Sequence, residues 1–160
     1  KFGYDVATAA NGEEALETIR LVLEKAGLDS DNVRSVLKVI ELHDVYDWTE
    51  KMIDKSIELQ VVQDADNLDA IGAIGIARTF AFGGANGLQM YFPGENLEFT
   101  KDFVEDPNHR TSTIAHFYEK LLRHKDNMNT KTGTRLAEER NKIMEDFLKQ
   151  FFNEWEGRFE

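Results

Sequence analysis

The sequence predicts an all-α fold, in which residues 1–160 form a single helical domain. Apolar residues recur at helical spacing in several long segments, and no segment alternates apolar and polar residues for long enough to indicate a sheet. A chain of 160 residues is long enough to bury one hydrophobic core. We therefore expect a bundle of helices.

The chain is strongly acidic, with 30 Asp and Glu against 19 Lys and Arg, and its net charge is -11. This charge disfavours binding to nucleic-acid polymers and to membranes, because both attract positive charge. A small phosphate-bearing molecule remains compatible, since one divalent cation and a few basic groups can hold its phosphates. Cysteine is absent, which excludes disulfides and fits a cytoplasmic protein.

Two amphipathic helices are predicted first, over residues 13–26 and 31–43, because apolar residues recur on one face of each. Gly27 closes the first helix as a C-cap. His43 comes at the end of the second helix. Its imidazole can face a phosphate or a metal, or it can hydrogen-bond to the backbone of its own helix, and the sequence leaves both interpretations open.

Residues 61–80 form the least polar long segment and predict a central helix with one buried face. This helix carries three aspartates within six positions, namely Asp64, Asp66 and Asp69. Asp66 is expected at the edge of the buried face, where a carboxylate is costly unless it is paired, hydrogen-bonded or bound to a metal. The three aspartates can equally be solvated, capping or ion-paired residues.

Glycines cluster after the central helix, with three in residues 83–87, and they predict that the helix does not continue there. Residues 83–110 are therefore expected to form a loop or a lid insertion. Residues 134–155 predict one long helix whose apolar seam packs in the core or joins two copies of the chain as a homodimer.

Residues 111–130 predict a further helix that carries a basic cluster in an otherwise acidic chain. The cluster consists of Lys120, Arg123 and Lys125, and it can either balance the phosphates of a substrate or form a solvated helix face.

Two segments carry a family resemblance. Residues 63–75, which include Asp-Ala-Asp-Asn-Leu-Asp-Ala, resemble the last motif of the HD-domain metal-dependent phosphohydrolases, in a bacterial branch that usually has Arg at the position of Asn67. Residues 111–130 are similar to the same branch through Thr-x-x-His-Phe-Tyr-Glu-Lys-Leu-Leu and Met-Asn-Thr. In this family a His and a His-Asp pair also bind the metal. The resemblance places them before Lys1, so we expect an N-terminally incomplete HD-domain-like bundle.

The resemblance implies a metal-dependent phosphohydrolase that acts on a nucleotide or a related phosphate ester. Asp66 would bind one divalent ion, whether Mn, Mg, Fe, Ni or Zn, and the ion would activate a water molecule. Asp64 and Asp69 are the candidate catalytic residues, which would orient a ligand or accept a proton. The candidate substrate-binding residues are His43, Arg78, Lys120 and Lys125.

A second function remains open from the sequence. Because the earlier metal-binding motifs are absent from these residues, the chain can instead be a catalytically incomplete helical module that binds or dimerises, and the metal would then be absent as well. A receiver-like signalling domain is disfavoured, since no short apolar strand ends in an aspartate near the start.

Overall fold

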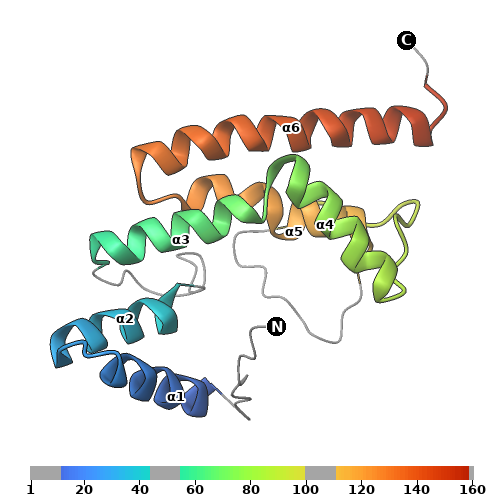
Figure 1. Cartoon of the computed structure of the whole chain (residues 1–160). Coiled ribbons are helices and arrows are strands. Elements are labelled where there is room, and N and C mark those ends of the chain that lie inside the picture. Colours follow the sequence, from blue (N-terminus) through green and yellow to red (C-terminus); the bar gives the residue numbers. More distant parts are fainter. Residues whose placement is uncertain (1–11, 44–54, 100–110, 159–160) are drawn as a thin grey trace, which may run out of the picture. The chain divides into compact units, whose positions relative to one another are not determined.

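The computed structural model describes residues 12–43, 55–99 and 111–158. Within these ranges every regular element is a helix, so the predicted all-α class is confirmed (Figure 1). The helices fall into two compact units, residues 1–44 and 45–160, and each unit is described by itself below. The single domain over residues 1–160 stays a prediction.

The first unit contains the two amphipathic helices that the sequence predicts, α1 (Gly12–Lys25) and α2 (Ser30–Leu42). Gly27 adopts a φ of 86° between them, a left-handed conformation that suits glycine. The side chain of Asp29 caps α2 by accepting hydrogen bonds from two backbone N–H groups.

The described residues of the second unit form five helices, and α3 and α4 lie along the long helix α6 (Figure 1). A short α-helix and a 3-10 helix, α5 and η1, complete it. In chain order the helices are α3 (Ile57–Asp69), α4 (Gly72–Ala85), α5 (Thr113–Glu119), η1 (Leu121–Asn127) and α6 (Lys131–Trp155).

The core of the second unit lies where α6 meets the other helices. Its buried residues are Ile71, Ile114, Phe117, Leu121, Ala137, Met144 and Leu148. The three core residues of α6 are spaced for one helix face, which confirms the predicted long amphipathic helix. Phe117 of α5 packs against Phe147 of α6, with 5.9 Å between the two ring centroids. This contact anchors α5 to the core.

The predicted continuous helix over residues 61–80 is wrong, because α3 ends at Asp69 and α4 begins at Gly72 with a bend of 64°. Gly72 has a φ of 78°, and a Cβ at this position would lie 3.0 Å from Cγ of Arg140. Glycine therefore permits the turn. Among the described helices none is by itself long and apolar enough to cross a membrane, and only this bent pair reaches that length and composition when taken together.

The glycines at the end of α4 do not stop the helix, contrary to the prediction. The helix runs through Gly83 to Ala85, so the predicted loop over residues 83–110 begins later than expected. A Cβ on Gly83 would clash with the Oγ1 atom of Thr113, which means that glycine allows α5 to approach α4 closely. Residues 100–110 of the predicted lid lie outside the described residues.

The predicted helix over residues 111–130 is divided into α5 and η1, and the backbone changes direction at Lys120, where φ is -134°. The turn after η1 leads into α6, whose first turn is capped by the hydroxyl of Thr130. These two short helices form the wall that faces α3 and α4.

Candidate functional site

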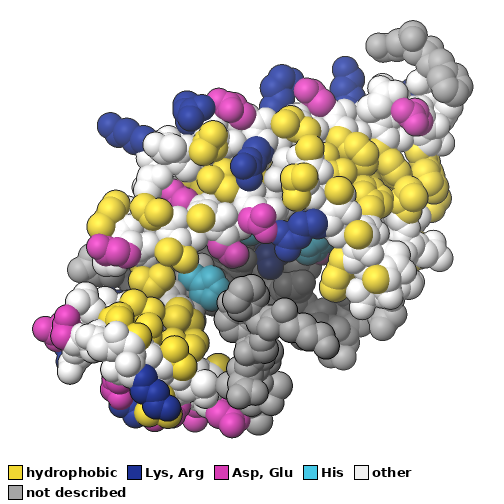
Figure 2. All heavy atoms as spheres, viewed as in Figure 1, with side chains coloured by type: hydrophobic (Ala, Val, Ile, Leu, Met, Phe, Trp, Pro, Cys, Tyr) yellow, Lys and Arg dark blue, Asp and Glu magenta, His cyan; other side chains and the backbone are white. Residues whose placement is uncertain are grey.

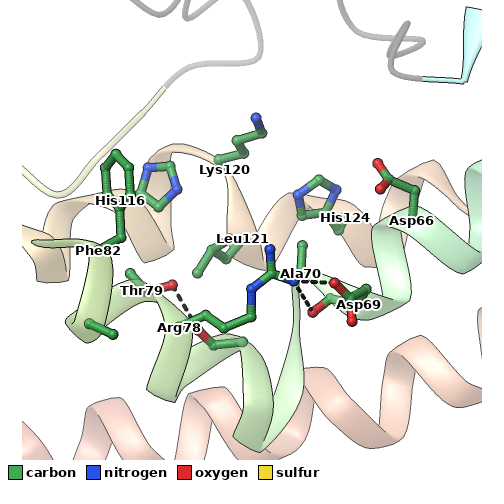
Figure 3. Close-up of a pocket in the computed structure, with 12 residues that line it drawn as sticks. Asp66, Asp69, Ala70, Arg78, Thr79, Phe82, His116, Lys120, Leu121 and His124 are labelled. Carbon is green, nitrogen blue, oxygen red and sulfur yellow. Dashed lines mark hydrogen bonds and ion pairs between the residues drawn. The ribbon is translucent and has the colours of Figure 1, made fainter. Parts of the chain in front are cut away.

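A cavity of about 450 Å³ lies in the second unit between the α3–α4 pair and the α5–η1 pair (Figure 3). Figure 2 shows acidic and basic side chains close together beside the junction of α3 and α4. The charged and imidazole-bearing residues that line the cavity are Asp66, Asp69, Arg78, His116, Lys120 and His124.

The carboxylates come from α3, and the basic groups come mainly from α5 and η1. Figure 3 shows Asp66 at one end of the cavity, with Phe82 and His116 at the other end. In a chain whose net charge is -11, this wall of imidazole and ammonium groups is a local exception. The cavity therefore has carboxylate oxygen atoms, the ligand type that hard divalent cations prefer, at one end, and hydrogen-bond donors of the type that can bind phosphate along one wall.

Asp66 is exposed on α3, whereas the sequence placed it at the edge of the buried face. Its carboxylate lines the cavity, and it makes no hydrogen bond or ion pair with any other described residue. Within residues 12–43, 55–99 and 111–158, however, no three His, Asp or Glu side chains are close enough to hold a metal ion together. Asp66 thus fits a metal as one oxygen ligand, and the described residues do not form a complete site.

Asp69 and Arg78 also line the cavity, and they form an ion pair across the bend between α3 and α4. The guanidinium of Arg78 additionally lies 3.4 Å from the backbone carbonyl oxygen of Asp69, to which it donates. The pair is visible in Figure 3 as dashed lines. The sequence predicted separate roles for these two residues, and the structure brings them together.

Asp64 is the buried carboxylate of α3, with 4% of its surface exposed, and it does not line the cavity. Its Oδ1 accepts hydrogen bonds from the backbone N–H of Asn129 at 2.7 Å and from the side-chain amide of Asn129 at 3.0 Å. Its Oδ2 accepts from the backbone N–H of Thr130 at 2.9 Å and from the Thr130 hydroxyl at 2.6 Å. Both oxygen atoms are therefore engaged with the start of α6.

The two lysines predicted to bind substrate are separated by the structure. Lys120 lines the cavity at the junction of α5 and η1. Lys125 does not line it, and its ammonium lies 3.6 Å from the carboxylate of Glu145 on α6. The prediction that Lys125 binds substrate receives no support from this geometry.

His116 and His124 also line the cavity, and the sequence predicted no role for either of them. His124 is 1% exposed, and burial, followed by the nearby charges of Lys120 and His116, lowers the pKa of its imidazole from 6.5 to about 4. At neutral pH it is therefore an uncharged ring. A spacing of four residues separates His116 from Lys120 and Lys120 from His124. In a helix this spacing places side chains on one face, so it could have indicated that the three side chains belong to one site.

His116 has a carboxylate neighbour on its own helix. Its Nδ1 lies 3.6 Å from Oε2 of Glu119, whose side chain is buried. A carboxylate beside an imidazole orients the ring. His116 can therefore present a ring N–H to a ligand in the cavity.

His43 belongs to the first unit, at the end of α2. Its Nδ1 lies 2.6 Å from the carbonyl oxygen of Ile40, which is the backbone hydrogen bond that one of the two sequence interpretations expected. Its role in binding a phosphate stays a prediction.

Known proteins resemble the chain in both sequence and structure. The uncharacterized protein YpgQ of Bacillus subtilis is 48% identical over 95 residues, which cover 59% of this chain and 38% of YpgQ. An HD-superfamily hydrolase from Bacillus thuringiensis superimposes with a TM-score of 0.70 at 39% identity, over 92% of this chain and 65% of that one. No protein-family model matches the sequence.

Two further solved structures are similar. A protein from Lactobacillus plantarum has a TM-score of 0.75 at 34% identity, over 92% of this chain and 70% of that one. The structure of YpgQ in complex with ADP has a TM-score of 0.65 at 37% identity, over 87% of this chain and 61% of that one. The chain thus spans between 61% and 70% of the lengths of the three solved structures, and the segment matched in sequence covers 38% of YpgQ.

Proposed function

The chain belongs to the HD superfamily of hydrolases, and from this premise we propose that it acts as a metal-dependent phosphohydrolase on a nucleotide. The observation that carries the proposal is the cavity, in which the carboxylate of Asp66 lies opposite a wall that bears His116 and Lys120. The ADP complex of the similar protein YpgQ supports a nucleotide as the substrate class.

The substrate phosphates are proposed to lie along the wall formed by α5 and η1. The ammonium of Lys120 and the imidazole of His116 line the cavity there, and both can donate hydrogen bonds to phosphate oxygens. The neutral ring of His124 lies on the same wall and can donate or accept one hydrogen bond without adding charge. These three side chains would fix the substrate before any bond is broken.

The metal is proposed to bind at Asp66, which is exposed to the cavity and supplies one carboxylate ligand. A bound divalent ion lowers the pKa of a water molecule and neutralises charge on phosphoryl oxygens. Because no three His, Asp or Glu side chains cluster in the described ranges, further ligands would have to come from outside these ranges.

The other aspartates are proposed to assist from α3. Arg78 holds the carboxylate of Asp69 at the edge of the cavity, where it can accept a proton from water. Asp64 fixes α3 against the start of α6 through its four hydrogen bonds, so it would position Asp66 and Asp69 without touching substrate.

Release of phosphate from ADP and ATP by the full-length protein tests the proposal. We expect phosphate or pyrophosphate to be released in the presence of Mn²⁺ and the release to stop when EDTA is added in excess. Hydrolysis that continues at an equal rate in EDTA would contradict the metal dependence, and the absence of hydrolysis with any divalent ion would contradict the phosphohydrolase itself.

A further inference from the structure

Phe82 is an apolar ring at the edge of a polar cavity. It lies on α4, it lines the cavity, and 65% of its surface is exposed. The neighbouring Phe80 packs instead against two core rings, at 6.0 Å from Phe117 and 5.7 Å from Phe147. Among the described aromatic residues none makes such a ring contact with Phe82. The ring therefore contributes little to the core of the described unit.

The approach of α4 to α5 fixes the place of this ring. Gly83 has no side chain, so Thr113 at the start of α5 lies directly against α4. Phe82 precedes that contact on α4, and His116 lies one turn beyond it on α5. Figure 3 shows both rings at the same end of the cavity, opposite Asp66.

Chemical character changes along the cavity in a fixed order. Phe82 lies about 10 Å along the axis of α4 from Gly75, since an α-helix rises 1.5 Å per residue. Asp69 and Asp66 follow beyond the bend, and Lys120 and His124 line the opposite wall between the two ends. Phe82 with His116 beside it, then Lys120, and then Asp66 follow one another along the cavity, an order that matches a base, its phosphates and a metal in a bound nucleotide.

We infer that Phe82 stacks on the nucleobase of the substrate and so selects nucleoside phosphates over phosphate compounds without an aromatic group. The inference rests on the proposed function and adds a specificity-determining residue to it. Every nucleobase offers a π-face, so a single exposed ring can stack on it without reading the identity of the base. The phosphates would then extend past Lys120 towards Asp66.

The test compares the binding of ADP with that of inorganic tripolyphosphate, which has no base. Dissociation constants are measured by calorimetry in EDTA, which stops metal-dependent turnover, and phosphate release from ADP is assayed separately with Mn²⁺. We expect F82A to raise the dissociation constant of ADP relative to that of tripolyphosphate by about 5- to 20-fold. For F82Y, which keeps a ring, we expect a ratio of the two dissociation constants close to that of the wild type. F92A is the matched control, because Phe92 is 38% exposed and does not line the cavity.

The outcomes separate the inference from the proposed function. An unchanged ratio of the two dissociation constants in F82A overturns the inference, and so does an equal loss of affinity for both compounds, which would indicate a packing role. A wild-type protein that does not bind ADP overturns it as well. Binding of ADP that F82A weakens, without phosphate release by the wild type, supports the stacking and contradicts only the hydrolysis.

Discussion

Asp64 of α3 accepts a hydrogen bond of 2.7 Å from the backbone N–H of Asn129, which lies 65 positions later in the chain. The side chains of Asn129 and Thr130 add two more hydrogen bonds to the same carboxylate. This contact joins the helix that carries Asp66 to the first turn of the long helix α6. Asp64 itself does not line the cavity, although it lies on the same helix as Asp66 and Asp69, which do.

Asp64→Asn is expected to lower the free energy of unfolding by about 2–4 kcal/mol. The new amide nitrogen would face groups that are themselves hydrogen-bond donors, and the negative charge that strengthens these bonds would be lost. Urea denaturation followed by circular dichroism measures the change. Asp66→Asn serves as the control and should stay within about 0.5 kcal/mol of the wild type, because Asp66 is exposed. Equal stability of all three proteins would contradict the role of Asp64.

Gly133→Ala should be destabilising although alanine is the better helix former. A Cβ at Gly133 would clash with the carboxylate of Asp64. The hydrogen bonds between Asp64 and the start of α6 would then have to break or lengthen. Gly84→Ala is the matched control, because Gly84 lies in α4 with no atom within 4 Å of an added Cβ. There we expect a gain of about 0.5–1 kcal/mol. The thermal unfolding temperatures of the two variants test this prediction. A higher unfolding temperature for Gly133→Ala than for the wild type would contradict close packing of Gly133 against Asp64.

His124 should make the folded state sensitive to acid. Its pKa is lowered from 6.5 to about 4 in the folded protein, so the unfolded chain takes up a proton first as the pH falls. The stability that this group contributes is fully present above about pH 6.5 and is lost between pH 6.5 and pH 4, by up to about 3 kcal/mol. The free energy of unfolding, measured in urea, should differ less between pH 7 and pH 4.5 for His124→Leu than for the wild type. An unchanged difference would show that the imidazole is not buried in its neutral form.

Lys120→Ala is expected to raise the KM for a nucleotide substrate by roughly 10- to 100-fold, because a charge-assisted hydrogen bond to phosphate would be lost. Steady-state phosphate release measures this change, and circular dichroism confirms the fold. Lys142→Ala provides the control, since Lys142 is exposed on α6, where it pairs with Asp146, and does not line the cavity. A KM that changes equally in both variants would argue for long-range electrostatics and against direct binding by Lys120.

Helical class and the extent of α6 could be predicted from the sequence, because both follow from local periodicity. The bend at Gly72 could not, since the side chain that a Cβ at this position would meet belongs to Arg140 of a distant helix. The continuation of α4 through Gly83 escaped prediction for a similar reason. Glycine usually ends a helix, but here it lets Thr113 pack against one.

The candidate site was predicted in part. Asp66, Asp69, Arg78 and Lys120 all line one cavity. Sequence periodicity placed Asp66 at the edge of the buried face and could not identify Asp64 as the buried residue. The hydrogen-bond donors that make the burial of Asp64 tolerable lie in another part of the chain. The sequence did not single out His116 and His124, although each is four residues from Lys120.

Manganese-dependent phosphate release from ADP by Asp66→Ala, compared with the wild type, tests the central claim most directly. The full-length protein should lose more than about 100-fold in activity, while its circular dichroism and thermal unfolding stay unchanged, because the proposed metal ligand is removed from an exposed position. Asp146→Ala, which alters an exposed carboxylate on α6, should keep full activity. Wild-type activity in Asp66→Ala would contradict the assignment of the metal to this residue.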